Sequence, residues 1–213
     1  MTSTRWALVT GATAGIGESF TRLLAAKGYN VALVARDEAR LHERAGALRE
    51  KYGVQTFVLP ADLATEAGCK AVEDYISTYP IEVLINNAGF GIKYPFTTSA
   101  LTAEQELLDV LVRTPMRLMH VILPGMKERN SGVIINVSSV ASFIAGGTYS
   151  AAKSYLTVLT EAVNTELKST NIKVSALCPG FTRTEFHQRG KMKMSGLPTV
   201  SYTHLTLPTI LRV

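Results

Sequence analysis

The segment that decides the fold is Thr10-Gly11-Ala12-Thr13-Ala14-Gly15-Ile16-Gly17. It follows a short apolar run, Trp6–Thr10, and precedes an amphipathic stretch, Glu18–Lys27. A strand, a glycine-rich turn and a helix in this order form the setting in which a dinucleotide-binding turn is expected. Gly11 permits a sharp exit from the strand, Gly15 lets the backbone approach a pyrophosphate, and Gly17 lets the helix pack closely on the sheet. The N–H groups of the helix would then face the phosphates.

The same alternation of short β-branched runs and longer amphipathic stretches continues along the chain. The short runs predict strands at Trp6–Thr10, Val31–Ala35, Val54–Leu59, Val83–Asn86, Val133–Val137 and Val174–Cys178. The longer stretches predict helices at Glu18–Lys27, Glu38–Lys51, Glu66–Tyr79, Ala103–Arg129 and Tyr149–Ser169. This order predicts an α/β fold with a doubly wound parallel sheet of the Rossmann type. Ligands are expected at the carboxyl ends of its strands.

Composition limits the classes of protein that the chain can represent. Its 213 residues, 46% of them apolar, can bury one substantial core, so a single domain is expected. No signal peptide and no apolar stretch of about 20 residues is evident, which predicts a protein that does not enter a membrane. Cys69 and Cys178 are far apart and suggest a reduced compartment, the cytoplasm, and no metal site. The net charge of +5 comes from scattered residues, so no nucleic-acid partner is expected.

Further motifs follow the predicted strands and carry a family resemblance. In order they are Asp62-Leu63, Asn86-Asn87-Ala88-Gly89, Ser138-Ser139, Tyr149-Ser150-Ala151-Ala152-Lys153 and Pro179-Gly180. Together with the GxxxGxG spacing of residues 11–17, they make residues 5 to about 197 resemble the short-chain dehydrogenase/reductase family. The resemblance implies an oxidoreductase that transfers hydride between a nicotinamide cofactor and a carbonyl or secondary alcohol.

The resemblance also implies which residues hold the cofactor. Asp62 would meet the adenine, and the segment after Pro179-Gly180 would touch the nicotinamide. The segment Asn86-Asn87-Ala88-Gly89 would line the adenosine side of the cofactor and steady the sheet. Asn86 and Asn87 have an alternative role, because asparagine often satisfies the backbone groups of a loop. The full set of expected cofactor-binding residues is Gly11, Thr13, Ala14, Gly15, Ile16, Gly17, Arg36, Asp62, Leu63, Asn87, Ala88, Gly89, Tyr149, Lys153, Pro179, Gly180, Thr182 and Thr184.

The choice of cofactor depends on the end of the second predicted strand. A carboxylate there would hydrogen-bond a ribose 2′-hydroxyl and repel a 2′-phosphate. The position that carries aspartate in NAD-preferring relatives matches Ala35, and the neighbouring Arg36 can pair with phosphate. Asp37 is interpreted as a first-turn residue of the next helix, placed favourably for the helix dipole. NADP(H) is therefore favoured, with NAD(H) as the alternative.

Tyr149 and Lys153 are four residues apart, so on a helix they lie on one face. A free tyrosine has a pKa of about 10, and a nearby ammonium in a partly buried site can lower it. By resemblance, Tyr149 is the general acid/base, while Lys153 lowers the pKa of Tyr149 and binds the nicotinamide ribose. Ser139 orients the substrate carbonyl, since relatives use the second serine of the pair and Ser138 would point to the opposite side of an extended segment.

Two features depart from the family pattern. The interval between Ser139 and Tyr149 is shorter by a few residues than in many relatives, so the loop Ala141–Thr148 must be tighter. The position that often carries a proton-relay asparagine matches Leu111, which cannot hydrogen-bond a water chain. Reduced or altered activity is expected. The alternative interpretation is a dinucleotide-binding sensor or scaffold protein of the same fold without turnover.

The expected partners are a small molecule and other copies of the chain. Ser139, Phe143, Ile144 and Phe181 are the expected substrate-binding residues, which favours a substrate with apolar surface. The resemblance implies that the full-length form is a homodimer or homotetramer. Residues 1–197 are expected to form the domain. Residues 198–213 are expected to be a tail, either non-native, because VSYTHLTLPTILRV from Val200 resembles translated sequencing-adapter DNA, or disordered.

Overall fold

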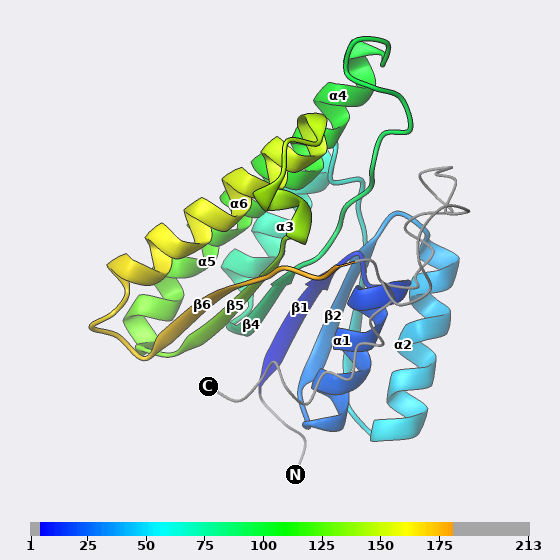
Figure 1. The fold of residues 1–213 in the computed structure, drawn as a ribbon. Coiled ribbons are helices and arrows are strands. Elements are labelled where there is room, and N and C mark those ends of the chain that lie inside the picture. The colour runs from blue at the N-terminus through cyan, green and yellow to red at the C-terminus, as the bar shows by residue number, and fades with distance from the viewer. Residues whose placement is uncertain (1–4, 181–213) are drawn as a thin grey trace.

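The sheet of the computed structural model, which describes residues 5–180, contains six parallel strands. They are β1 (Trp6–Thr10), β2 (Asn30–Ala35), β3 (Thr56–Pro60), β4 (Ile81–Asn86), β5 (Gly132–Val137) and β6 (Ile172–Leu177). Their spatial order, β3-β2-β1-β4-β5-β6, reverses direction between β1 and β4 (Figure 1). The predicted doubly wound sheet is confirmed, and the strand ends differ from the predicted ends by at most two residues.

Two layers of helices cover the sheet because successive strand residues point to opposite faces. On one face, Ala7 and Val9 of β1 pack with α1 (Gly15–Ala26) and α2 (Glu38–Tyr52). On the other face, Leu8 packs in a core with α3 (Glu66–Thr78), α5 (Thr114–Arg129) and α6 (Gly147–Glu166). Both faces of the central strands are therefore buried, which explains their nearly continuous apolar sequence.

The expected single helix over Ala103–Arg129 is interrupted. The structure has α4 (Leu101–Leu108), a π-helical turn at Asp109–Arg113, and then α5. The Thr114 N–H bonds the Asp109 carbonyl five residues back, and Pro115 has no N–H to donate to the carbonyl of Leu111. The helical path is thus continuous but locally wider beside Leu111.

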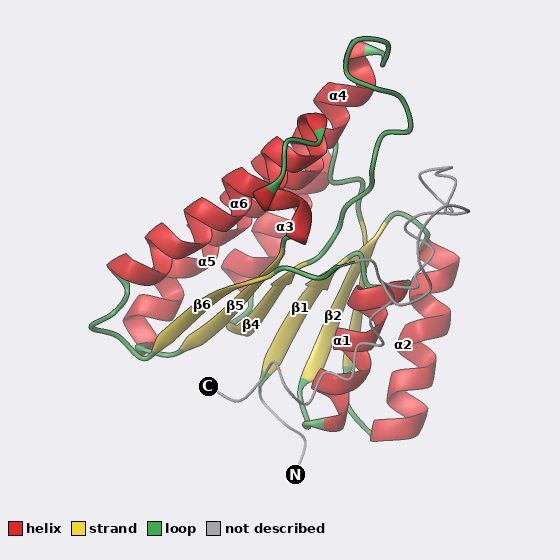
Figure 2. Cartoon of the chain, viewed as in Figure 1, coloured by secondary structure: helices red, strands yellow, loops and turns green. Residues whose placement is uncertain are grey.

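The loops that matter for ligand binding lie at the carboxyl ends of the strands. Figure 2 shows the connections after β1, β4 and β5 at one end of the sheet. In doubly wound folds the crevice at the strand-order reversal, here between β1 and β4, is the usual ligand site. Among the helices of residues 5–180, none combines the length and apolar content needed to cross a membrane.

Candidate active site

The glycine-rich turn has the backbone shape that its sequence requires. Gly11 and Gly15 have φ values of +66° and +56°, in the left-handed region that favours glycine. A Cβ on Gly17 would lie 2.2 Å from the Gly11 carbonyl oxygen, so only glycine allows α1 to begin this close to the turn. The side chain of Ala14, before α1, makes no capping hydrogen bond. The first N–H groups of α1 are consequently suited to a phosphate.

The ends of β1 and β4 are tied together next to this turn. The side-chain amide of Asn87 donates to the carbonyls of Thr10 at 2.9 Å and Gly11 at 3.2 Å. The Thr10 hydroxyl accepts from the backbone N–H groups of Asn87 and Ala88 at 2.9 and 3.0 Å. Asn87 thus satisfies loop backbone groups, which was one of its two predicted roles, and it ties the end of β4 to the end of β1.

Two arginines follow β2, Arg36 directly after the strand and Arg40 in the first turn of α2. Arg36 is exposed, as a residue that meets a phosphate would be in the free protein. Asp37 is the N-cap of α2, because its Oδ1 accepts from the Arg40 N–H at 3.0 Å, so its carboxylate is engaged with the helix. Arg40, which the sequence analysis missed, donates from Nη2 to the Thr13 carbonyl at 3.4 Å. The sequence did contain a signal for Arg40, because a second arginine follows Arg36 within the first turn of the next helix.

The turn after β3 holds Asp62 and Leu63 in different environments. Asp62 is exposed, and its Oδ1 accepts from the Ala64 N–H at 3.1 Å. Leu63 is buried, and its carbonyl accepts from the Thr114 hydroxyl at 2.9 Å. Asp62 is therefore accessible to a ligand, and its contact with adenine stays a prediction, while Leu63 anchors the turn to α5.

Tyr149 and Lys153 lie one turn apart in α6, with the Lys153 Nζ 5.7 Å from the centre of the Tyr149 ring. The Lys153 side chain is buried, and its Nζ donates to the Val137 carbonyl at 2.7 Å. Burial lowers the pKa of Lys153 to about 8, since the charged form loses its hydration. At neutral pH Lys153 therefore keeps its proton, and its buried charge lowers the stability of the folded state.

The two serines at the end of β5 point in opposite directions, as their alternation predicts. Ser138 is buried, and its hydroxyl lies 2.7 Å from that of Thr157 and donates to the Lys153 carbonyl at 3.0 Å. Ser139 is half-buried and shares a side-chain hydrogen bond with Tyr149. Ser139 and Tyr149 therefore form a pair of hydroxyl groups that can meet one substrate oxygen.

The protonation of Tyr149 differs from the expectation that Lys153 lowers its pKa. Burial raises the pKa of Tyr149, and the hydrogen bond with Ser139 only partly opposes this. The physical reason is that the buried phenolate would lose its hydration, which the charged form needs most. In this state Tyr149 is suited to hold a proton and to donate it.

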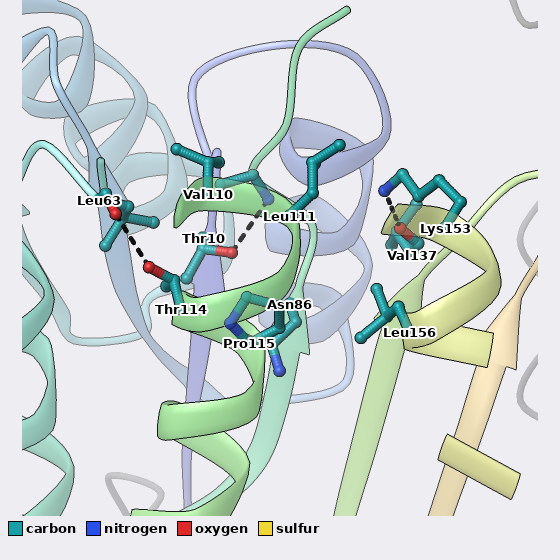
Figure 3. Close-up of a pocket in the computed structure, with 11 residues that line it drawn as sticks. Thr10, Leu63, Asn86, Val110, Leu111, Thr114, Pro115, Val137, Lys153 and Leu156 are labelled. Carbon is teal, nitrogen blue, oxygen red and sulfur yellow. Dashed lines mark hydrogen bonds between the residues drawn. The ribbon is translucent and has the colours of Figure 1, made fainter. Parts of the chain in front are cut away.

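Leu111 lies beside these groups in the widened part of the helix. It is buried and lines a small cavity together with Thr10, Asn86 and Lys153 (Figure 3). A Cβ on Gly89 would lie 2.8 Å from Leu111 Cδ2 and 4.0 Å from Lys153 Nζ. The backbone at Gly89 therefore packs closely against Leu111 and lies near Lys153.

The expected substrate-binding residues lie in accessible positions where the structure describes them. Phe143 is 70% exposed and Ile144 is 65% exposed, at the end of the short 3-10 turn that begins after Ser139. The Pro179 carbonyl accepts from the Val140 N–H at 3.1 Å, which brings the Pro179-Gly180 segment beside the same turn. Phe181, Thr182, Thr184 and the tail 198–213 lie outside the described residues.

Known proteins resemble this chain in both sequence and fold. The sequence model described as short chain dehydrogenase matches residues 5–194. The very-long-chain 3-oxoacyl-CoA reductase of Anas platyrhynchos is 30% identical over 220 residues, which cover 96% of this chain and 68% of the relative. Inactive hydroxysteroid dehydrogenase-like protein 1 of Homo sapiens is 31% identical over 186 residues, covering 84% and 56%. The chain spans about half to two thirds of the length of the curated relatives it matches.

A solved structure extends the similarity to three dimensions. The short-chain dehydrogenase from Sphingobium yanoikuyae in complex with NADPH has a TM-score of 0.89 and 33% identity. The alignment covers 93% of this chain and 79% of that protein.

Proposed function

Because the chain belongs to the short-chain dehydrogenase family, we propose that it transfers hydride between NADP(H) and a carbonyl or secondary alcohol. The observation that carries the proposal is the meeting of Ser139, Tyr149 and Lys153 at the carboxyl end of β5, beside the crevice between β1 and β4. NADPH oxidation measured with a panel of ketones tests it. The proposal fails if the protein binds NADPH but oxidises it with none of them.

The residues that would hold the cofactor fit a dinucleotide. Gly11, Gly15 and Gly17 have no side chain that could keep a pyrophosphate from the backbone, and α1 begins without a side-chain cap. Arg36 and Arg40 supply positive charge at the end of β2, while Asp37 is engaged in capping α2. NADP(H) is therefore preferred over NAD(H). When bound, the cofactor supplies or accepts the hydride.

The side chains divide the proton chemistry between them. Tyr149 holds a proton that it donates to the substrate oxygen in reduction, or accepts one in oxidation. Ser139 donates a hydrogen bond to the same oxygen and polarises the carbonyl. Lys153 binds the nicotinamide ribose and, as an ammonium close to the Tyr149 ring, stabilises the negative charge that forms on the phenol during reduction.

The rates of ketone reduction and alcohol oxidation should depend differently on pH. Tyr149 is protonated at neutral pH because its pKa is raised, so ketone reduction is expected to be constant near neutrality. Above a pH of about 8, Lys153 loses its proton and its charge, and the reduction rate should fall. Alcohol oxidation needs the deprotonated phenol and should rise with pH until Lys153 titrates. Plots of kcat/KM against pH in both directions check this, and a reduction rate that climbs steadily through the pKa of Lys153 would contradict it.

The preference for NADPH should depend on both arginines at the end of β2. Arg36→Gln and Arg40→Gln are each expected to lower kcat/KM for NADPH by about tenfold, since a charge-assisted hydrogen bond contributes at least that much. The value for NADH should stay nearly constant. Arg49→Gln is the matched control, because Arg49 lies in the last turn of α2 and donates to Thr56. Equal losses with both cofactors would instead indicate damage to the glycine-rich turn.

The substrate that fits the site has an apolar body. Phe143 and Ile144 are large and exposed, and only a short 3-10 turn separates them from Ser139 in the chain. They can therefore cover such a substrate. The relative from Anas platyrhynchos is named for a reductase of very-long-chain 3-oxoacyl-CoA, which is compatible with a long apolar substrate here. Ketones of increasing chain length, compared by KM, distinguish an apolar site from a polar one.

A second candidate function is dinucleotide binding without turnover. Leu111 supports it, because a buried aliphatic side chain beside Lys153 cannot relay a proton, and one relative is named as inactive. NADPH-binding calorimetry together with the ketone panel separates the two candidates. Tight binding with no turnover supports the second.

We further propose a cytoplasmic homodimer or homotetramer formed through the long helices. Exposed apolar side chains lie on α4 and α5, at Leu108 and Met116, and on α6, at Tyr155 and Val158. Such side chains favour association because it removes them from water. Light scattering after gel filtration measures the oligomeric state, and a monomer at micromolar concentration would contradict the assembly.

A further inference from the structure

A chain of buried amide groups links the ends of β4 and β5 to α6. The Asn86 Nδ2 donates to Asn136 Oδ1 at 2.9 Å, and the Asn136 Nδ2 donates to the Thr160 hydroxyl at 2.8 Å. The Thr160 hydroxyl donates its one proton to the Leu156 carbonyl at 2.5 Å. Its oxygen must therefore accept from Asn136, which fixes the orientation of the Asn136 amide and, through it, that of Asn86.

This orientation leaves the other side-chain atom of Asn86 without a partner. Asn86 is 5% exposed, and its Oδ1 has no hydrogen bond to any residue between 5 and 180. A buried carbonyl oxygen without a partner is rare, and an ordered water is a common explanation. Figure 3 shows Asn86 between the helix that carries Leu111 and the helix that carries Lys153.

Asn86 and Lys153 line the same small cavity, whose volume is about 10 Å³. That is close to the space that a single water molecule needs. The Lys153 ammonium has three protons, and the bond to the Val137 carbonyl uses one of them. Thr114, also in the wall, donates its hydroxyl proton to Leu63 and can still accept. The cavity therefore offers a water one donor and two acceptors.

The other side chains that line the cavity cannot serve as hydrogen-bond partners for a water in place of Asn86, Lys153 and Thr114. Leu111 and Leu156 are aliphatic. The Thr10 hydroxyl already donates to the Ile85 carbonyl and accepts from two backbone N–H groups. A water in the cavity would therefore accept from Lys153 and donate to Asn86 and Thr114.

We propose that one buried water molecule links Asn86 Oδ1 to Lys153 Nζ, and that Asn86 is a positioning residue for the lysine. The water gives the buried ammonium a second hydrogen bond and holds it near Tyr149. Its effect on turnover rests on the proposed function, whereas the water itself and the titration of Lys153 do not.

Two substitutions in the same amide chain test the proposal. Asn86→Leu removes the oxygen that has no partner among residues 5–180 and leaves Asn136 Oδ1 without its donor. Thr160→Ser removes a buried methyl group at the far end of the chain but keeps the hydroxyl that orients both amides, so Asn86 Oδ1 stays in place. The pKa of Lys153 is measured by NMR of its ¹³Cε group, assigned by comparison with Lys153→Arg. Asn86→Leu should lower this pKa by about one pH unit, because a hydrogen bond to a charged group is lost. Thr160→Ser should leave it unchanged.

A high-resolution crystal structure of the unsubstituted protein provides the second measurement. One ordered water within hydrogen-bond distance of both Asn86 Oδ1 and Lys153 Nζ supports the proposal. An empty cavity, an unchanged Lys153 titration in Asn86→Leu, or equal shifts in both variants would overturn it. If Asn86→Leu does not fold, the crystal structure decides. If the water and the titration behave as expected but no ketone is reduced, the proposed function fails alone.

Discussion

Tyr149→Phe is expected to lower kcat/KM for ketone reduction by about a thousandfold, the range typical of a lost general acid. The substitution removes only the hydroxyl, so the ring should keep its place in the half-buried site beside Ser139 and the Lys153 side chain. The affinity for NADPH should change little. Stopped-flow or steady-state NADPH oxidation measures the loss, and fluorescence titration measures the binding of NADPH.

The same helix provides the control for this experiment. Tyr155 also lies on α6 but is exposed, and Tyr155→Phe should leave both turnover and NADPH binding intact. Retention of most of the rate in Tyr149→Phe would remove Tyr149 from the chemistry. A comparable loss in Tyr155→Phe would point to a disturbed helix.

Lys153→Met is expected to abolish activity and, at the same time, to stabilise the fold. The pKa of Lys153 falls from 10.5 to about 8 on folding, so the unfolded chain binds the proton more tightly. Below a pH of about 8, this difference costs the folded state roughly 3 kcal/mol. The lost hydrogen bond to Val137 offsets about 1 kcal/mol of the gain. The net effect at neutral pH is a stabilisation of about 2 kcal/mol, or a rise in Tm of about 6 °C.

The sign of the pH dependence provides a further check. As the pH rises from about 8 towards 10.5, the lysine is neutral in the folded state and the burial cost disappears. The advantage of Lys153→Met should therefore shrink over this window. Lys168→Met, at an exposed position after α6, should show neither effect. Urea unfolding at several pH values measures this, and a less stable Lys153→Met protein at neutral pH would contradict the expectation.

Local sequence features were sufficient to predict the sheet and most of its helices. The strands are short and buried on both faces, so they appear as β-branched runs, and the helices between them have apolar residues at helical spacing. The π-helical turn was not predictable in this way. The turn Asp109–Arg113 packs against α6, and a residue count along one helix does not contain that contact.

In the candidate site, too, some features were predictable from local sequence and others depended on tertiary packing. The four-residue interval between Tyr149 and Lys153 and the alternation of Ser138 and Ser139 were enough to predict which side chains share a face. Arg40 was missed, because its proximity to Thr13 depends on the packing of α2 against the glycine-rich turn.

By itself the sequence determined the parallel doubly wound sheet, the glycine-rich turn and the residue types of the site, because periodicity and glycine spacing act over a few neighbouring residues. Tertiary structure alone decided the protonation preferences of Tyr149 and Lys153 and the orientation of Asn86. The reason is physical. Burial and hydrogen bonding set a pKa, and both depend on groups that lie far apart in the chain, such as Val137 beside Lys153.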